Sequence, residues 1–189
     1  MRERDADLDD AVSYRINDSD QICYVSDGYE AFARDNDGAA AAGSVVMHRA
    51  LWEFITDSTT QQLYRDVIRR VRDGRSLQFE IRCDSARLRR LLRMDVSRLA
   101  TGEIEFNVTL LKKERRAFQP LLAADAPRSN ELLRMCGWCK KVGIEGRWLE
   151  VEDAVRELRL FEQALLPQLT HGICEACCRK MVDALERTG

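Results

Sequence analysis

The hydrophobic positions between residues 57 and 110 change from a helical to a strand period. Asp57 offers an N-terminal cap and Gly74 an end, and four apolar residues between them recur at helical spacing: Leu63, Val67, Ile68 and Val71. Apolar and polar residues then alternate over 77–84, 92–97 and 103–110. We therefore expect a helix followed by three antiparallel strands that share one apolar face.

Two shorter strands and a helix are expected before this segment. Residues 14–16 and 22–25 are short apolar stretches on either side of a turn, and residues 29–34 follow the capping residues Ser26 and Asp27. The first ten residues include five acids and two arginines. Such a charged stretch cannot bury apolar surface, so we expect a disordered tail over residues 1–10.

The pattern after residue 113 predicts a linker and a smaller second module. Residues 114–130 hold two prolines among small and charged residues, which indicates a linker between a first domain at 11–113 and a module at 131–189. Within the mainly helical module we expect a short apolar helix at 132–135, a hairpin over 140–148, an amphipathic helix over 150–166, and a final helix that begins beside Cys174 and ends near Arg187.

Composition indicates a cytoplasmic globular protein. The formal net charge of −2 gives no global attraction to nucleic acid or to an acidic membrane. No apolar run is long enough to cross a bilayer, and the first residues lack the apolar core of a signal peptide. Thiols stay reduced in the cytoplasm, so the seven cysteines suggest metal binding or redox chemistry rather than a disulfide framework.

Two cysteine pairs near the C-terminus carry the most specific chemistry. Cys136 and Cys139 form one Cys-x-x-Cys turn, and Cys174 and Cys177 form another. Each turn can direct two sulfurs at one centre, and four thiolates satisfy a tetrahedral Zn²⁺ ion. We therefore expect these four residues to bind a structural zinc ion, which leaves no open coordination position for catalysis.

Other interpretations of the cysteines remain open. Either pair can be a redox dithiol, so that oxidation would release the metal. His171 is an alternative ligand or a hydrogen-bond donor to a thiolate. Cys178 is expected to point away from the metal and to pack as a small apolar side chain, as are Cys23 and Cys83. The arginines between residues 82 and 98 are expected to form a solvated sheet edge with local ion pairs.

The first domain resembles the PAS family. Two short strands, a helical middle and three antiparallel strands are the element order of a PAS domain. Arg15-Ile-Asn-Asp-Ser-Asp-Gln-Ile22 resembles its opening hairpin, and Leu51-Trp-Glu-Phe-Ile55 resembles the helical turn that often follows. The resemblance implies a sensing or dimerisation domain, and whether its interior holds a small ligand stays open.

The cysteine module resembles a treble-clef zinc module with an inserted helix. Cys136-x-Trp138-Cys139-Lys140-Lys141 together with His171-Gly172-Ile173-Cys174-x-x-Cys177 is similar to a C-terminal element of bacterial signalling proteins that carry PAS or receiver domains. The resemblance implies an α+β sensor protein whose output is a changed contact with a partner protein.

The sequence offers no motif for catalysis. It has no phosphate-binding glycine loop or nucleophile elbow, and only two histidines, so we expect no enzyme activity. A thiol redox switch is one alternative function. The other is a nucleic-acid-binding zinc module that uses Lys140, Lys141, Arg179 and Lys180, although we do not expect nucleic acid or a membrane as a partner. A homodimer through the PAS-like domain is compatible with the sequence.

Overall fold

The computed structural model describes residues 12–35 and 42–187 of the chain, and the charged segment expected to be a tail lies outside these residues. The fold is mixed α+β. Internal contacts divide the chain into two units, which we call the sheet unit (1–79, 93–110 and 184–189) and the cysteine unit (80–92 and 111–183). The expected domain limits, 11–113 and 131–189, differ from these units and stay predictions.

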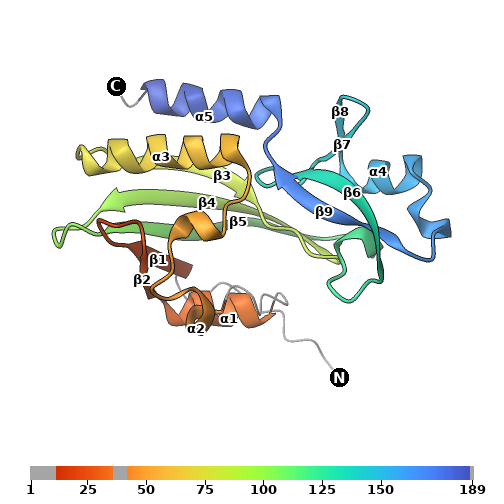
Figure 1. The fold of residues 1–189 in the computed structure, drawn as a ribbon, viewed down its shortest axis with the longest axis horizontal. Coiled ribbons are helices and arrows are strands. Elements are labelled where there is room, and N and C mark those ends of the chain that lie inside the picture. The colour runs from red at the N-terminus through yellow and green to blue at the C-terminus, as the bar shows by residue number, and fades with distance from the viewer. Residues whose placement is uncertain (1–11, 36–41, 188–189) are drawn as a thin grey trace. The chain divides into compact units, whose positions relative to one another are not determined.

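The larger sheet has the strand order β2-β1-β5-β4-β3 (Figure 1). Strand β1 (Val12–Ile16) pairs antiparallel with β2 (Ile22–Val25) and with β5 (Ile104–Arg115), in a register that places Tyr14 opposite Phe106. Strands β3 (Leu77–Arg82) and β4 (Leu88–Arg98) complete the sheet. The alternating segments of the sequence therefore form the three expected strands.

Helix α3 (Ser58–Arg72) forms where the helical period predicts it. The side chain of Asp57 accepts a hydrogen bond from the amide of Thr60, which satisfies a donor that a helix N-terminus otherwise leaves without a partner. Gly74 follows the helix with φ of +91°, a conformation that costs glycine little. The four apolar residues of the helix are all buried.

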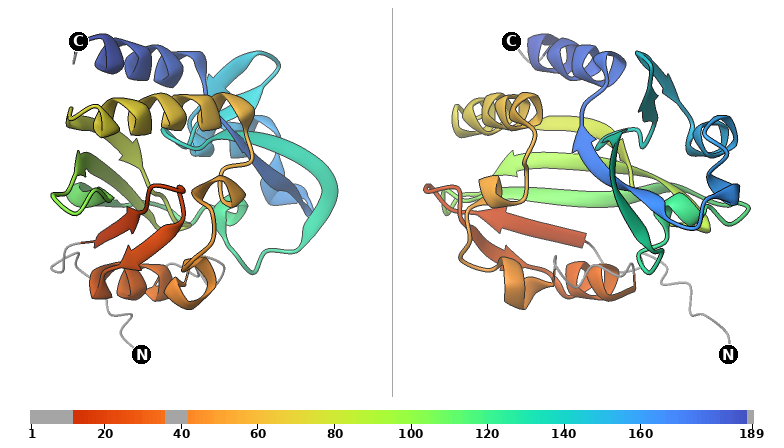
Figure 2. Two further views of the ribbon diagram at one scale, coloured as in Figure 1. Left: turned by 60° about the vertical axis from the view of Figure 1, so that its left-hand side comes forward. Right: turned by 45° about the vertical axis from the view of Figure 1, so that its right-hand side comes forward.

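Shorter helices lie between β2 and α3. They are α1 (Asp27–Asp35), α2 (Gly43–Val46) and the 3-10 turn η2 (Leu51–Glu53). Figures 1 and 2 show α1 and α2 beside β1 and β2, and α3 alongside β3 and β4. Aromatic rings fill part of the sheet unit: Tyr14 stacks on Phe106 with centroids 4.6 Å apart, and the ring of Tyr64 lies 6.4 Å from that of Phe106.

A second sheet organises the cysteine unit, in the order β8-β7-β6-β9. Strand β6 (Arg128–Cys136) pairs antiparallel with β7 (Val142–Ile144) and parallel with β9 (Leu166–Gly172). Strands β7 and β8 (Arg147–Leu149) form the expected hairpin. Residues 132–135 are therefore strand, and the expectation of a short helix there is wrong.

The expectation of one amphipathic helix over residues 150–166 is also wrong, because the helix that forms is much shorter. Helix α4 spans only Val151–Glu157, followed by the 3-10 turn η4 (Leu160–Glu162) and then by β9. Arg159 adopts a left-handed conformation with φ of +52°, which ends the helix. Phe161 and Leu165 fall at helical spacing with Val151 and Val155, which would place them on the buried side of that helix, but they are 67% and 51% exposed. The module is thus not mainly helical, because pairing with β6 takes residues 166–172 into a sheet.

The segment expected to be a linker contributes to this unit. The 3-10 turn η3 (Pro120–Leu122) buries Leu121 completely, in a hydrophobic cluster with Met135, Val142 and Val155. The guanidinium of Arg128 donates hydrogen bonds to the carbonyls of Leu121, Ala123 and Pro167. Residues 114–130 are therefore packed and hydrogen-bonded over much of their length.

Candidate metal centre

The first cysteine turn lies between β6 and β7. Cys136 is the last residue of β6, and its backbone N–H donates to the carbonyl of Lys141 at 2.8 Å. The backbone N–H of Lys140 donates to the Cys136 carbonyl at 3.0 Å, and Lys140 adopts a left-handed conformation with φ of +59°. This tight reversal places the side chains of Cys136 and Cys139 on the same side of the turn.

The second turn connects β9 to the final helix. Helix α5 spans Glu175–Arg187, as the sequence predicts, and Cys174 precedes it at the capping position. The amide of Cys177 lies 3.4 Å from the Cys174 sulfur, the contact that a capping side chain makes with the third residue of a helix. The amide of Cys178 donates to the Cys174 carbonyl at 2.9 Å.

The parallel pairing of β6 with β9 brings the two turns together. Cys136 lies opposite Gly172 in the register, and the amide of Gly137 donates to the Gly172 carbonyl at 2.8 Å. One turn therefore follows the end of each strand at the same edge of the sheet. The sequence predicts a short helix before the first pair and a helix beginning at the second, so the strand pairing that joins them was not predicted.

The four sulfur atoms form one group. All four atoms lie within 4.8 Å of one another, and they belong to Cys136, Cys139, Cys174 and Cys177. The sulfurs of Cys139 and Cys174 are 3.7 Å apart. Sulfurs that bind one Zn²⁺ at about 2.3 Å in a tetrahedron are about 3.8 Å apart. The residues therefore fit a Cys₄ metal site with little adjustment.

Hydrogen bonds favour thiolate character at the centre of this group. The sulfur of Cys136 accepts from two thiols, those of Cys139 and Cys177, and from two backbone amides, those of Cys139 and Cys174. These hydrogen bonds lower the pKa of Cys136 well below the ordinary thiol value. Hydrogen bonds to the charged form of a group stabilise that form. A thiolate is also the form that binds a metal ion.

His171 is outside the group of clustered ligand atoms. It lies opposite Met135 in the β6–β9 register, and the four clustered groups among the described residues are all cysteines. Although much of the residue is exposed, desolvation of its ring and the positive charge of Lys140 lower its pKa. The geometry therefore supports cysteine ligands rather than His171.

The remaining thiols lie outside the cluster as well. Cys23 is half-buried and its thiol lies 3.5 Å from the carbonyl of Arg15. Cys83 is half-buried, and desolvation raises its pKa. Cys178 is half-buried in the first turn of α5. None of the three belongs to the group of ligand atoms found among the described residues.

A buried ion network supports the first cysteine turn, and sequence reasoning missed it. The backbone amide of Arg82 donates to the carbonyl of Trp138 at 2.6 Å, within the turn itself. The side chain of Arg82 binds Asp84 and also Glu150, the latter at 2.7 Å. Burial opposes the charge of Arg82, but these two carboxylates raise its pKa overall. Arg82 therefore links the turn to the residue that precedes α4.

Asp84 is the centre of this network. Its side chain is 0% exposed, accepts hydrogen bonds from Arg82, and forms an ion pair at 3.3 Å with Arg116, whose side chain is 8% exposed. Arg116 also pairs with Glu152 at 3.2 Å, and Arg89 pairs with the same carboxylate at 3.1 Å. The expectation of a solvated sheet edge is therefore wrong for Arg82. The signal available in the sequence was that only two acids, Asp84 and Asp95, stand among the arginines of residues 82–98.

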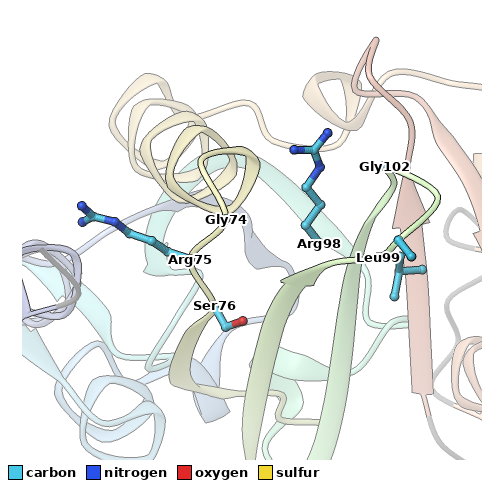
Figure 3. A pocket seen from close by; sticks show the side chains of 7 residues that line it. Gly74, Arg75, Ser76, Arg98, Leu99 and Gly102 are labelled. Atoms are coloured by element: carbon cyan, nitrogen blue, oxygen red, sulfur yellow. The ribbon is translucent and has the colours of Figure 1, made fainter.

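A pocket in the sheet unit does not form a second site. It has a volume of about 350 Å³ and is lined by Gly74, Arg75, Ser76, Arg98, Leu99, Ala100 and Gly102. Figure 3 shows the side chains of Arg75 and Arg98 pointing in different directions. The guanidinium of Arg98 donates to the carbonyl of Arg72 at 3.0 Å. The two cations therefore do not converge on one ligand.

Comparison with known proteins gives no match: no protein-family model fits this chain, and no curated protein is similar to it in sequence. Among residues 12–35 and 42–187, no helix is both long enough and apolar enough to cross a membrane. The function must therefore be inferred from the geometry of the cysteine centre and from the fold.

Proposed function

We propose that this protein is a non-catalytic signalling protein of the bacterial cytoplasm, in which a PAS-like sensing or dimerisation domain is coupled to a zinc-stabilised protein-interaction module. The observation that carries the proposal is the group of four cysteine sulfurs within 4.8 Å. Cys136, Cys139, Cys174 and Cys177 would hold a Zn²⁺ ion, which would supply a cross-link between two distant segments of chain.

The element order supports the PAS-like part of the proposal. Two short strands, a helical segment and three strands follow one another, and β5 returns to pair with β1. The cysteine unit supports a treble-clef-like arrangement. A cysteine turn is followed by the hairpin of β7 and β8, and the last two cysteines lie at the start of a helix.

A closed four-cysteine centre favours a structural role over catalysis. Catalytic zinc sites keep one coordination position open for water or substrate, and they rely mostly on histidine and carboxylate ligands. Here all four clustered groups are cysteines, and two of them, Cys136 and Cys174, are 0% and 2% exposed. We therefore infer that the module presents a surface, and that the signal would be passed to a partner protein.

The metal part of the proposal is tested by elemental analysis of the purified full-length chain. We expect about one zinc per chain, because four thiolates complete one tetrahedral site. An absorbance spectrum of the same sample tests for a chromophore in the PAS-like domain. Substoichiometric metal after purification without chelator, and after reconstitution with zinc under reducing conditions, would contradict the proposal.

The interaction part is tested by site-specific photocrosslinking in the native cell. A photoreactive amino acid at Leu132, which is 68% exposed on β6, reports on partners of the cysteine unit. We expect a discrete protein adduct that disappears when Cys136→Ser is added. The same photoreactive amino acid in place of Arg156, an exposed residue of α4, serves as the control position. Crosslinks to nucleic acid, or a pattern unchanged by Cys136→Ser, would contradict an interaction module of this kind.

A further inference from the structure

A pocket of about 510 Å³ lies within the cysteine unit and shares several residues with the ion network around Asp84. It is formed by side chains from β4, from the end of β5 and the residue after it, and from the first turn of α4. The lining residues are Arg89, Glu114, Arg115, Arg116 and Glu152. A pocket of this volume can hold a small molecule.

Two arginines of the pocket each carry a hydrogen-bond donor without a partner. Over residues 12–35 and 42–187, four buried side-chain nitrogen or oxygen atoms lack a partner, and two of them are the Nε atoms of Arg89 and Arg116. Buried polar groups in folded proteins nearly always have a partner, because an unsatisfied one is destabilising. An arginine side chain can only donate. The two Nε atoms therefore indicate a ligand that supplies acceptor atoms.

One carboxylate holds the other ends of these two guanidinium groups. Nη2 of Arg89 lies 3.1 Å from a Glu152 oxygen, and Nη1 of Arg116 lies 3.2 Å from the other oxygen of the same carboxylate. Arg116 is also fixed by Asp84 at 3.3 Å and by the carbonyl of Ser85 at 2.8 Å. The two cations are therefore positioned before a ligand arrives, which reduces the ordering cost of binding.

The charges of the lining favour an anion over a cation. Three arginines and two glutamates give the lining a formal charge of +1. The carboxylate of Glu152 is engaged by two arginines, and that of Glu114 pairs with Lys112 at 2.6 Å. A metal ion would have to displace these cations. An oxyanion instead receives charge-assisted hydrogen bonds from guanidinium groups, whose planar shape suits carboxylate and phosphate.

We propose that this pocket binds a small molecule through an oxyanion, a carboxylate or a phosphate group, which accepts hydrogen bonds from the Nε atoms of Arg89 and Arg116. The side chain of Arg116 is 8% exposed and forms the fixed part of the site. That of Arg89 is 33% exposed, so it can turn its buried Nε toward an incoming ligand. The site uses no cysteine, and the inference goes beyond the proposed function by giving the cysteine unit a ligand of its own.

The test is calorimetric titration of the purified full-length chain with succinate and, separately, with inorganic phosphate. Sodium chloride holds the ionic strength constant, so that general screening does not change during the titration. We expect at least one of the two anions to bind saturably, one per chain, with a dissociation constant of about 1 mM or lower. The two titrations distinguish a carboxylate from a phosphate ligand. Absence of saturable binding in both would overturn the inference, because solvent alone would then satisfy the two donors.

Arg89→Lys tests the site directly. Lysine keeps the positive charge but lacks the Nε donor and the planar guanidinium group. We expect the dissociation constant to increase roughly tenfold or more, as for the loss of one hydrogen bond to a charged group. Arg93→Lys is the matched control, because Arg93 lies on the same strand, is 39% exposed and pairs with Asp95 at 3.0 Å, but does not line the pocket. Equal weakening in both variants, or none in Arg89→Lys, would overturn the inference.

The wild-type chain gives a second readout that decides the question if Arg89→Lys fails to fold. A proton–nitrogen correlation NMR spectrum resolves the Nε–H groups of arginine side chains. Those of Arg89 and Arg116 should shift together as the anion is added, with the dissociation constant found by calorimetry, whereas that of Arg93 should not shift. Binding that moves neither signal would overturn the inference. Zinc content of the same sample tests the proposed function separately, so the two failures are distinguishable.

Discussion

The backbone amide of Cys174 lies 3.4 Å from the sulfur of Cys136, a contact between residues 38 positions apart. It connects the capping position of α5 with the end of β6. The β6–β9 register already places Gly172 opposite Cys136, so the sheet sets the distance between the two cysteine turns. The strand pairing and this hydrogen bond bring the two cysteine turns close together, and a metal ion would stabilise that arrangement.

Replacement of Cys136 by serine tests the importance of that position. We expect Cys136→Ser to abolish stoichiometric zinc binding and to destabilise the cysteine unit, because Cys136 is buried and lies at the centre of the sulfur group. Zinc content by elemental analysis and thermal unfolding measure the two effects. Loss of a structural zinc removes on the order of 10 kcal/mol of apparent folding free energy at neutral pH.

Cys178→Ser is the matched control, because Cys178 is near the centre but outside the group of ligand atoms. It should keep about one zinc per chain and change stability by roughly 0.5 kcal/mol or less, as expected for a substitution away from a special feature. Zinc loss of equal size in both variants would show that the cluster does not define the ligand set.

Removal of the metal should melt the cysteine unit and leave the sheet unit folded. The proposed zinc ion would cross-link segments of the cysteine unit alone, whereas the sheet unit has a buried core of its own that includes Ile16, Val71 and Phe106. Trp138, which is 7% exposed, reports on the cysteine unit, and chelation should shift its fluorescence to longer wavelength. Circular dichroism and limited proteolysis should show that only part of the chain unfolds. Unchanged fluorescence and protease resistance after complete zinc removal would contradict this prediction.

Local patterns predicted the sheet unit well. Asp57 and Gly74 mark the ends of α3, and the alternation around Phe106 and Leu92 reflects strands with one covered face. These signals depend on neighbouring residues, so a sequence displays them directly. The four clustered cysteines could also be identified, because each pair carries its own spacing within a single turn.

The architecture around the cysteines could not be predicted in the same way. In the sequence, Phe161 and Leu165 continue an apolar stripe at helical spacing. In the structure, Arg159 ends the helix and residues 166–172 pair with β6. Parallel pairing depends on a partner about 35 residues away, which no local period reveals. Asp84 was similarly hidden, because one of its two arginine partners, Arg116, lies 32 residues further along the chain.

Removal of the buried carboxylate should cost more than removal of any surface acid. Asp84→Ala leaves Arg82 and Arg116 without the carboxylate that both contact, at 13% and 8% side-chain exposure. Breaking a buried ion pair in this way costs about 3–5 kcal/mol. The free energy of unfolding, measured with denaturant on the zinc-loaded chain, gives the loss directly.

Asp153→Ala is the comparison for this effect. Asp153 pairs with Arg156 on the surface of α4, and their side chains are 54% and 76% exposed. Exposed ion pairs contribute about 0–1 kcal/mol, so the change should be small. Similar losses in the Asp84 and Asp153 variants would show that the network around Asp84 is not a major source of stability.

The alkaline stability of the sheet unit should depend on Tyr64. Burial raises the pKa of Tyr64 to about 12, because the phenolate would lie in a poorly solvated site. The unfolded chain loses this proton near pH 10 and the folded chain does not, so folding stability falls between about pH 10 and 12. A shift of about two pKa units corresponds to at most about 2.7 kcal/mol. Tyr64→Phe should remove part of this decrease, because burial also raises the pKa of Tyr14 well above its ordinary value. Denaturant unfolding at pH 9, 10 and 11 measures the effect, and Tyr24→Phe at a 38% exposed position is the control. An alkaline decrease that is unchanged in Tyr64→Phe would contradict the assignment.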